Sequence, residues 1–237
     1  MKILIIVTNI SSYQNHNLPT GLWLSEITHM YDACVKNNIE VTVASPNGGN
    51  TPIDPESLGY FTMDKISKKY YNDVAFMELL KNTVAVKEVN SANFNAIYLT
   101  GGHGTMYDFV GNATLSNMIK SFYENNKTVS AVCHGVCGLI DVKLSTGDYL
   151  LKDKKITGYS WFEEKLAKRK QQVPFNLQQV LKEKKANYKK GLFPLTSFVV
   201  TDNNLITGQN PFSSKEIAKE VVKQIIKNST PTNTLKN

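Results

Sequence analysis

The chain has 237 residues, 41% of them hydrophobic, and a formal net charge of +7 at pH 7. This composition is ordinary for a soluble globular protein that buries a hydrophobic core. Three cysteines without framework spacing argue against a disulfide scaffold and favour a reducing compartment. No apolar run approaches the roughly 20 residues of a membrane helix, and the N-terminal run is too short for a secretory signal. We therefore expect a cytoplasmic protein with no membrane contact.

The positive charge does not indicate nucleic-acid binding. The lysines are scattered, and the local excess between Lys165 and Lys190 is mixed with Glu163, Glu164 and Glu183, as on a solvated helical face. A recognised binding motif and interleaved aromatic residues are both missing. We expect no nucleic-acid partner.

Buried strands and helices alternate in the first half of the chain. Residues 3–7 are aliphatic throughout, as in a central parallel strand covered on both faces. The predicted segments are strands over 3–7 and 39–44, helices over 20–36 and 73–81, and an irregular excursion over 52–71 above the strand ends.

The first predicted helix carries an apolar stripe with a carboxylate at its edge. Thr20 is a suitable N-cap, and the helical neighbours of Glu26 are the apolar Leu22, Trp23 and Met30. A Glu26 carboxylate that points into this desolvated space has a raised pKa. The alternative is a side chain that reaches solvent.

The same alternation continues through the second half. The predicted segments are strands over 96–100, 128–132, 155–159, 195–201 and 205–207, helices over 112–125 and 213–227, a helical region over 163–185 broken at Pro174, a hairpin or loop over 141–153, and a polar, disordered tail over 228–237.

This order of elements predicts an α/β fold with a doubly wound parallel sheet and helices on both faces. No internal repeat or linker interrupts it, so we expect one domain over residues 1–227, with loop or cap excursions near 46–72 and 160–192. Ligands of such sheets bind beyond the carboxyl ends of the strands.

Two segments at these strand ends carry chemistry. The strand over 128–132 stops at Cys133, and such a strand-to-helix turn resembles a nucleophile elbow. A helix N-terminus favours the thiolate, so we expect a partly ionised thiol at neutral pH; the alternative is a buried, inert cysteine. The glycines of 101–104 let a ligand approach backbone amides, or they form an ordinary tight turn. Cys137 is either a resolving thiol or a small packing residue.

Five separated motifs resemble the DJ-1/PfpI superfamily, and specifically its Hsp31-like branch. They occur in family order and span nearly the whole chain: GLWLSE at 21–26, YLTGGHGTMYDF at 98–109, AVCHGVCGLI at 131–140, KITGYSWFEE at 155–164 and LITGQNP at 205–211. The resemblance implies a flavodoxin-like fold with a small added cap region, and a homodimer.

The resemblance also implies roles for individual residues. Cys133 resembles the nucleophile, His134 its base, and Glu26 the carboxylate that hydrogen-bonds the sulfur. Backbone amides of Gly102 and His134 resemble the donors that face the substrate oxygen, and Gly101 and His103 belong to the same substrate-binding turn. An acid after the Thr-Gly-aromatic motif orients the histidine, and spacing from Ile156 favours Glu164 over the adjacent Glu163.

The activity implied by the resemblance is a glutathione-independent glyoxalase of the D-lactate dehydratase type, a lyase that converts methylglyoxal to lactate without a cofactor. The alternatives are a protein deglycase, a stress-related holding chaperone that binds unfolded proteins, and a thiol redox sensor. The four histidines, His16, His29, His103 and His134, all lie before the C-terminal third, which argues against a glutamine-hydrolysing triad. His16 and His103 lack ligand spacing, so we expect no metal site.

Overall fold

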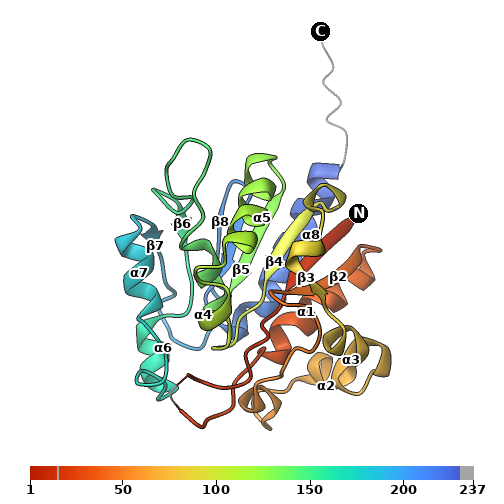
Figure 1. The fold of residues 1–237 in the computed structure, drawn as a ribbon. Helices are drawn as coiled ribbons and strands as arrows, with labels where there is room; N and C mark the ends of the chain where they lie inside the picture. The colour runs from red at the N-terminus through yellow and green to blue at the C-terminus, as the bar shows by residue number, and fades with distance from the viewer. Residues whose placement is uncertain (15, 230–237) are drawn as a thin grey trace.

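The computed structural model describes residues 1–14 and 16–229, and a seven-stranded sheet with the order β3-β2-β1-β4-β5-β9-β8 lies at its centre (Figure 1). Its strands are β1 Lys2–Ile6, β2 Glu40–Ser45, β3 Val84–Ala85, β4 Ala96–Leu99, β5 Thr128–Val132, β8 Val199–Asp202 and β9 Leu205–Gly208. All neighbours pair in parallel except β8, which pairs antiparallel with β9. The predicted flavodoxin-like α/β class is confirmed.

Helices cover both faces of this sheet (Figure 1). Helix α1 (Leu24–Lys36) packs against α8 (Ser214–Ser229) on one face, and α5 (Ala113–Glu124) packs on β4 and β5 on the other. The shorter α-helices are α2 Lys65–Tyr71, α3 Val74–Lys81, α4 Thr105–Asp108, α6 Trp161–Leu166 and α7 Leu177–Glu183, and the 3₁₀ helices are η1 Pro55–Leu58, η2 Val86–Glu88, η3 Ser91–Asn93, η4 Cys133–Leu139 and η5 Pro211–Ser213.

The central strands are buried on both sides, which explains their continuous apolar sequence. Every residue of β4 and β5 is buried, as are Ile3 to Ile6 of β1. In α1 the apolar stripe Ile27, Met30 and Cys34 is fully covered. The hydrophobic effect therefore fixes this part of the fold, and the periodic sequence pattern predicts it correctly.

The start of α1 differs from the prediction. Trp23, not Thr20, is the N-cap, and its side chain makes no capping hydrogen bond. Thr20 Oγ1 donates instead to Asp54 Oδ2 at 2.9 Å. The chain before the helix is extended because Leu22 exchanges backbone hydrogen bonds with Pro52 and Asp54. A tertiary contact thus overrides the local capping signal.

The excursion predicted as irregular contains two short helices. Asp54 caps η1 through the N–H of Glu56, and Asp64 caps α2 through the N–H of Ser67. Aspartate is a favoured N-cap, so these signals were present in the sequence. Lysines and tyrosines make up most of α2, so its apolar stripe is too weak to predict a helix.

The region before β8 differs most from the prediction. The strand predicted over 155–159 is only β6, Lys155–Ile156, which pairs with β7, Asn187–Tyr188, in a separate two-stranded sheet that was not predicted. The helical region is α6 and α7 with Pro174 between them, as the proline predicts. Strand β8 begins four residues later than predicted, after Leu195 in left-handed backbone.

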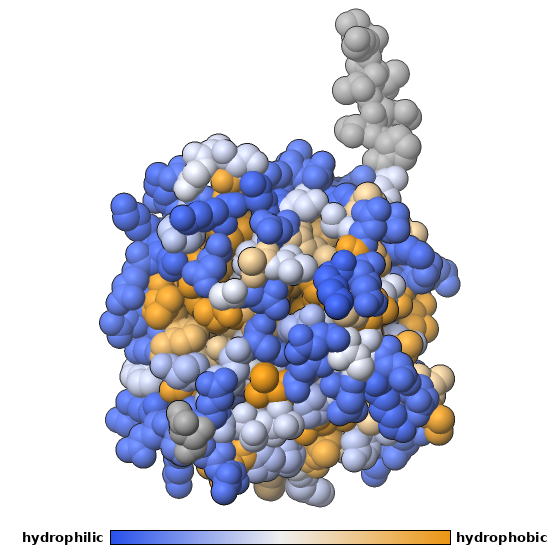
Figure 2. All heavy atoms as spheres, in the orientation of Figure 1, coloured by the Kyte–Doolittle hydropathy of each residue, from blue (hydrophilic) through white to orange (hydrophobic). Residues whose placement is uncertain are grey.

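The C-terminal helix α8 continues to Ser229, so the prediction of disorder is wrong for residues 228 and 229. The remainder of the predicted tail lies outside the described residues. Hydrophilic side chains cover most of the face seen in Figure 2, and apolar side chains gather on it beside the α6–α7 segment. No helix in the described ranges is long and apolar enough to cross a membrane.

Candidate active site

Cys133 lies directly after β5 on a strained turn. Its φ is 56° and its side chain is 2% exposed. Left-handed backbone is costly for a residue with a Cβ atom, and the turn is held because the next segment packs tightly on β4. A Cβ atom on Gly135 would lie 2.1 Å from the Thr100 carbonyl oxygen, so only glycine fits there. The turn continues as the 3₁₀ helix η4 rather than the predicted α-helix.

The surroundings of the Cys133 sulfur oppose the predicted partial ionisation. Burial raises the pKa of Cys133 well above its ordinary value, and the neighbouring Glu26 adds to this effect. The backbone N–H groups of His134 and Gly102 act in the opposite direction but do not compensate. The prediction counted a helix dipole and left out the loss of solvent, which has the stronger effect on this buried sulfur. Attack by the sulfur therefore needs a base.

His134 is placed to be that base. Its Nδ1 lies 3.4 Å from Cys133 Sγ, and its Nε2 lies 2.8 Å from Glu164 Oε2. If Nε2 donates its proton to the carboxylate, Nδ1 is left as an acceptor for the thiol proton. Burial opposes ionisation of Glu164, but the imidazoles of His134 and His103 outweigh it and hold the pKa of Glu164 well below its usual range.

His103 shares the same carboxylate. Its Nε2 lies 2.9 Å from Glu164 Oε1, and its ring centroid lies 4.1 Å from that of His134. Burial first, and then the nearby His134, lower the pKa of His103, so its imidazole is neutral near pH 7. Its Nδ1 is buried without a hydrogen-bond partner and is free to accept a hydrogen bond from a ligand.

One ligand atom each from His103, His134 and Glu164 lie within 4.8 Å of one another, a spacing that could hold a metal ion. Sequence spacing did not predict this cluster because its members come from three separate segments, the turn after β4, the turn after β5 and helix α6. Both Nε2 atoms already contact the carboxylate, so a metal ion would have to replace these hydrogen bonds. His16 does not contribute, since its Nε2 contacts the Gln171 carbonyl at 3.2 Å.

Glu26 is fully buried on the first turn of α1, so the alternative of a side chain that reaches solvent is wrong. Burial raises the pKa of Glu26 to about 8, as predicted. The Gly101 N–H donates to Oε2 at 2.5 Å. The other oxygen, Oε1, has no hydrogen-bond partner. The contact of the carboxyl group with the Cys133 side chain lowers the pKa of Glu26, but burial has the larger effect.

The glycine turn packs against both reacting side chains. A Cβ atom on Gly101 would lie 2.7 Å from Glu26 Oε2 and 2.9 Å from Cys133 Cβ. Gly102 has a φ of +95°, and its Cβ would lie 2.0 Å from the Gly21 carbonyl oxygen. A side chain at position 101 or 102 would therefore collide with its neighbours, and only glycine fits at these two positions. The backbone N–H of Gly101 faces the Glu26 carboxyl group, and that of Gly102 faces the Cys133 sulfur.

The two adjacent glutamates have different surroundings. Glu164 contacts the histidines, whereas Glu163 accepts hydrogen bonds from the loop at Leu195 and from the side chains of Gln209 and Asn210.

Cys137 is buried and donates its S–H to the Thr105 carbonyl at 3.3 Å, which fits the packing role rather than that of a resolving thiol.

Cys133 and the two histidines face a pocket of about 520 Å³. Besides Cys133, His103 and His134, it is lined by Trp23, Ser25, His29, Phe61, Thr62, Asp64, Tyr159, Leu166, Ala167, Leu195, Pro211, Phe212 and Lys215. Sequence reasoning missed this wall. Tyr159 belongs to the KITGYSWFEE motif, and its ring lies 4.3 Å from that of His134, but the wall residues from the loops carry no local signal.

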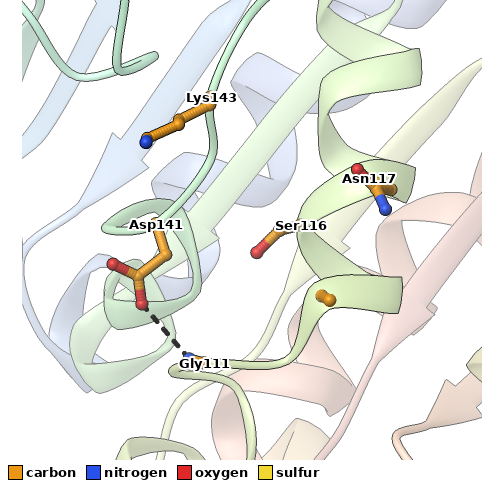
Figure 3. Close-up of a pocket in the computed structure, with 6 residues that line it drawn as sticks. Gly111, Ser116, Asn117, Asp141 and Lys143 are labelled. Carbon is orange, nitrogen blue, oxygen red and sulfur yellow. Dashed lines mark hydrogen bonds between the residues drawn. The ribbon is translucent and has the colours of Figure 1, made fainter.

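A second, smaller hollow of about 280 Å³ lies elsewhere, between the start of α5 and the loop after η4 (Figure 3). The Gly111 N–H donates to Asp141 Oδ2 at 3.2 Å, and Ala113, Ser116, Asn117 and Lys143 also line the hollow. These lining residues include no cysteine or histidine.

Comparison with known proteins agrees with this geometry. The family model "DJ-1/PfpI family" matches residues 18–224. Glyoxalase 3 of Candida albicans is 28% identical over 93% of this chain and 97% of its own length, and glutathione-independent glyoxalase HSP31 of Saccharomyces cerevisiae is 29% identical over 92% and 94%. The crystal structure of the Candida albicans glyoxalase III has a TM-score of 0.85 at 27% identity, with 94% of this chain and 96% of that one covered. The X-ray structure of the Francisella tularensis Rapid Encystment Protein of 24 kDa has a TM-score of 0.90 at 37% identity, with 94% and 98% covered. The chain belongs to the DJ-1/PfpI family.

Proposed function

We propose that this protein is a glutathione-independent glyoxalase that converts methylglyoxal and water to lactate. The observation that carries the proposal is the joint contact of the Cys133 thiol with the His134 base and with the buried, high-pKa carboxyl group of Glu26, at a point where Cys133 and His134 line a pocket. Relatives that match nearly the whole chain bear this activity in their names.

The first step is addition of the sulfur to the aldehyde. His134 Nδ1 takes the thiol proton, the sulfur bonds to the aldehyde carbon, and the carbonyl oxygen takes up a proton to give a hemithioacetal. Glu164 stabilises the transient imidazolium. The backbone amides of Gly102 and His134, which already face the sulfur, stabilise negative charge that develops on the oxygen.

The second step moves hydrogen between adjacent carbons. Glu26 takes the proton from the former aldehyde carbon to give an enediolate. It then returns this proton to the neighbouring carbon, while the hydroxyl proton on the sulfur-bearing carbon moves to the neighbouring oxygen, and the product is a lactoyl thioester. The unpartnered Oε1 of Glu26 is available for this transfer. Water, activated by His134, then cleaves the thioester, releases lactate and restores the thiol. Atoms balance without an external oxidant or reductant.

Substitution of the nucleophile tests this mechanism. Cys133→Ser should abolish lactate formation from methylglyoxal, because a serine hydroxyl next to the same base is a much weaker nucleophile for a reversible aldehyde addition. The measurement is steady-state lactate production by wild type and variant, with Cys137→Ser as the matched control. Intact turnover in Cys133→Ser would contradict the mechanism, and absence of lactate with the wild type would contradict the proposed function.

A holding chaperone is a second candidate, favoured by exposed apolar side chains, of which Phe61 lines the pocket. Tyr60, Phe61, Leu192 and Phe193 are 91%, 94%, 96% and 70% exposed, and such surfaces bind unfolded chains. Suppression of aggregation of a model client by the Cys133→Ser variant, together with no lactate formation by the wild type, would favour this candidate.

The resemblance to the Hsp31-like branch extends the proposal to a stress-related role in the cytoplasm and to a homodimer. The free, buried state of all three cysteines supports a reducing compartment. Light scattering on the purified protein tests the homodimer, and a monomer at micromolar concentration would contradict it.

A further inference from the structure

Leu195, a residue of the pocket wall, is held in a strained backbone conformation. Its φ is 56°, in the left-handed region, where leucine is strained and glycine is not. Its side chain lines the pocket and is 43% exposed. The Leu195 N–H donates to Glu163 Oε1 at 3.0 Å, so a buried carboxylate stabilises the strained turn.

The same carboxylate holds a second part of the wall. Asn210 Nδ2 donates to Glu163 Oε1 at 2.7 Å, and Gln209 Nε2 donates to Oε2 at 2.9 Å. Asn210 is followed directly by Pro211 and Phe212, which line the pocket. Glu163 itself is 0% exposed and also accepts from the N–H and Oγ of Ser160. One buried carboxyl group therefore fixes two loops that are separated in the sequence.

These two loops form an apolar surface in the pocket that holds Cys133. The apolar wall, defined as Leu195, Pro211 and Phe212, leaves Phe212 54% exposed. A pocket of about 520 Å³ is several times larger than methylglyoxal, whose methyl group fills little of it. Ligand pockets bind mainly through apolar surface and use a few polar groups for orientation.

We propose that Glu163 is a positioning residue that holds the apolar wall against the apolar substituent of the substrate, and that the preferred substrates are 2-oxoaldehydes with a large apolar substituent, such as an aryl group. This inference rests on the proposed glyoxalase function. Glu164 contacts the histidine of the reacting centre, whereas the adjacent Glu163 contacts the wall, so the two glutamates affect different kinetic constants.

The distinguishing variant is Glu163→Gln, which keeps the size of the side chain but replaces one acceptor oxygen with an NH₂ group. Both oxygens of Glu163 accept from at least two donors, so the amide leaves some donors unsatisfied and loosens a wall loop. The assay compares phenylglyoxal with glyoxal, which has no substituent to bind. We expect KM for phenylglyoxal to rise about fivefold or more relative to KM for glyoxal, since lost apolar contact weakens binding.

If Glu163 had a purely structural role, Glu163→Gln would lower the fraction of active protein. The kcat values for phenylglyoxal and glyoxal would then fall equally, and the ratio of the two KM values would not change. Glu164→Gln is the contrast, and should lower kcat for both. Glu163→Asp, which keeps the charge and both oxygens, should restore part of the phenylglyoxal KM.

Leu195→Gly is the second variant, because glycine readily adopts the left-handed backbone and folding is therefore preserved. Leu195→Gly should raise the ratio of KM for phenylglyoxal to KM for glyoxal. The control Leu192→Ala, at an exposed residue outside the pocket lining, should leave this ratio unchanged. An unchanged ratio in both Glu163→Gln and Leu195→Gly, or a wild type that turns over glyoxal more efficiently than phenylglyoxal, would overturn the inference. Failure of the wild type to convert either aldehyde would instead overturn the proposed function.

Discussion

The carboxyl group of Glu26 has two distinct oxygens. One accepts a hydrogen bond from the Gly101 N–H, and the other is buried without a partner. Burial raises its pKa to about 8, so near pH 7 a minor fraction of Glu26 is ionised. The ionised form is a stronger base than an ordinary carboxylate. A general base works best when its pKa lies near the operating pH. At this scale the chemistry depends on solvent exclusion around one side chain.

Substitution of Glu26 tests this role. The kcat/KM for methylglyoxal should rise with pH and level off above about 8, because the base must lose its proton. Glu26→Gln should reduce kcat by at least about 10²-fold and remove this pH dependence, with little change in the circular dichroism spectrum. Unchanged turnover would remove Glu26 from the mechanism.

At the level of secondary structure, two turns at the carboxyl ends of parallel strands and the first turns of two helices, α1 and α6, bring the site together. The turn after β4 supplies the glycines, the turn after β5 supplies Cys133 and His134, and α6 supplies Glu164. Helix α1 is fixed against β4 by the Tyr98 hydroxyl, which donates to the Glu26 carbonyl at 3.0 Å. The rigid sheet thus sets the distances between groups far apart in the sequence.

A methyl group on the turn after β4 should disturb these distances. In Gly101→Ala the new Cβ atom would contact Glu26 Oε2 and Cys133 Cβ, and overpacking of this kind costs about 1–3 kcal/mol. We expect kcat/KM to fall by about 10²-fold, because a displacement near 1 Å is enough for such a loss.

The control is Gly147→Ala, at an exposed glycine with a φ of +89° and with no atom within 4 Å of the new Cβ. It should lower the thermal stability, because alanine at a positive φ is strained, but it should leave turnover normal. A normal rate in Gly101→Ala would show that the turn does not position the two reacting side chains.

At the scale of the whole molecule, the buried acids of the site link stability to pH in opposite directions. Glu26 has an ordinary pKa of 4.5 and a folded-state pKa of about 8. Between these pH values the folded protein keeps a proton that the unfolded chain releases, so the free energy of unfolding falls as the pH rises through this window. Glu164 has a lowered pKa, so its contribution is present above its ordinary pKa and is lost as the pH falls through the folded value.

Glu26→Gln should therefore stabilise the protein increasingly from about pH 5 to about pH 9, by on the order of a few kcal/mol at the alkaline end, since each pKa unit corresponds to about 1.4 kcal/mol. Denaturant titrations at several pH values measure this directly. Glu164→Gln is the control and should lower stability near neutral pH. A pH-independent difference between Glu26→Gln and wild type would show that Glu26 is not the buried acid responsible.

Features that depend on local pattern could be predicted from the sequence. Aliphatic runs predicted β1, β4 and β5, the apolar stripe predicted α1, and glycines beside Cys133 predicted an elbow, because periodicity and turn chemistry are properties of neighbouring residues. Features that depend on burial and on distant partners could be seen only in the folded chain. There, burial opposes ionisation of Cys133, α1 begins after Thr20, and Glu163 faces the apolar wall while Glu164 faces His134. Solvent exclusion and long-range hydrogen bonds arise when segments far apart in the chain meet, and no local pattern encodes them.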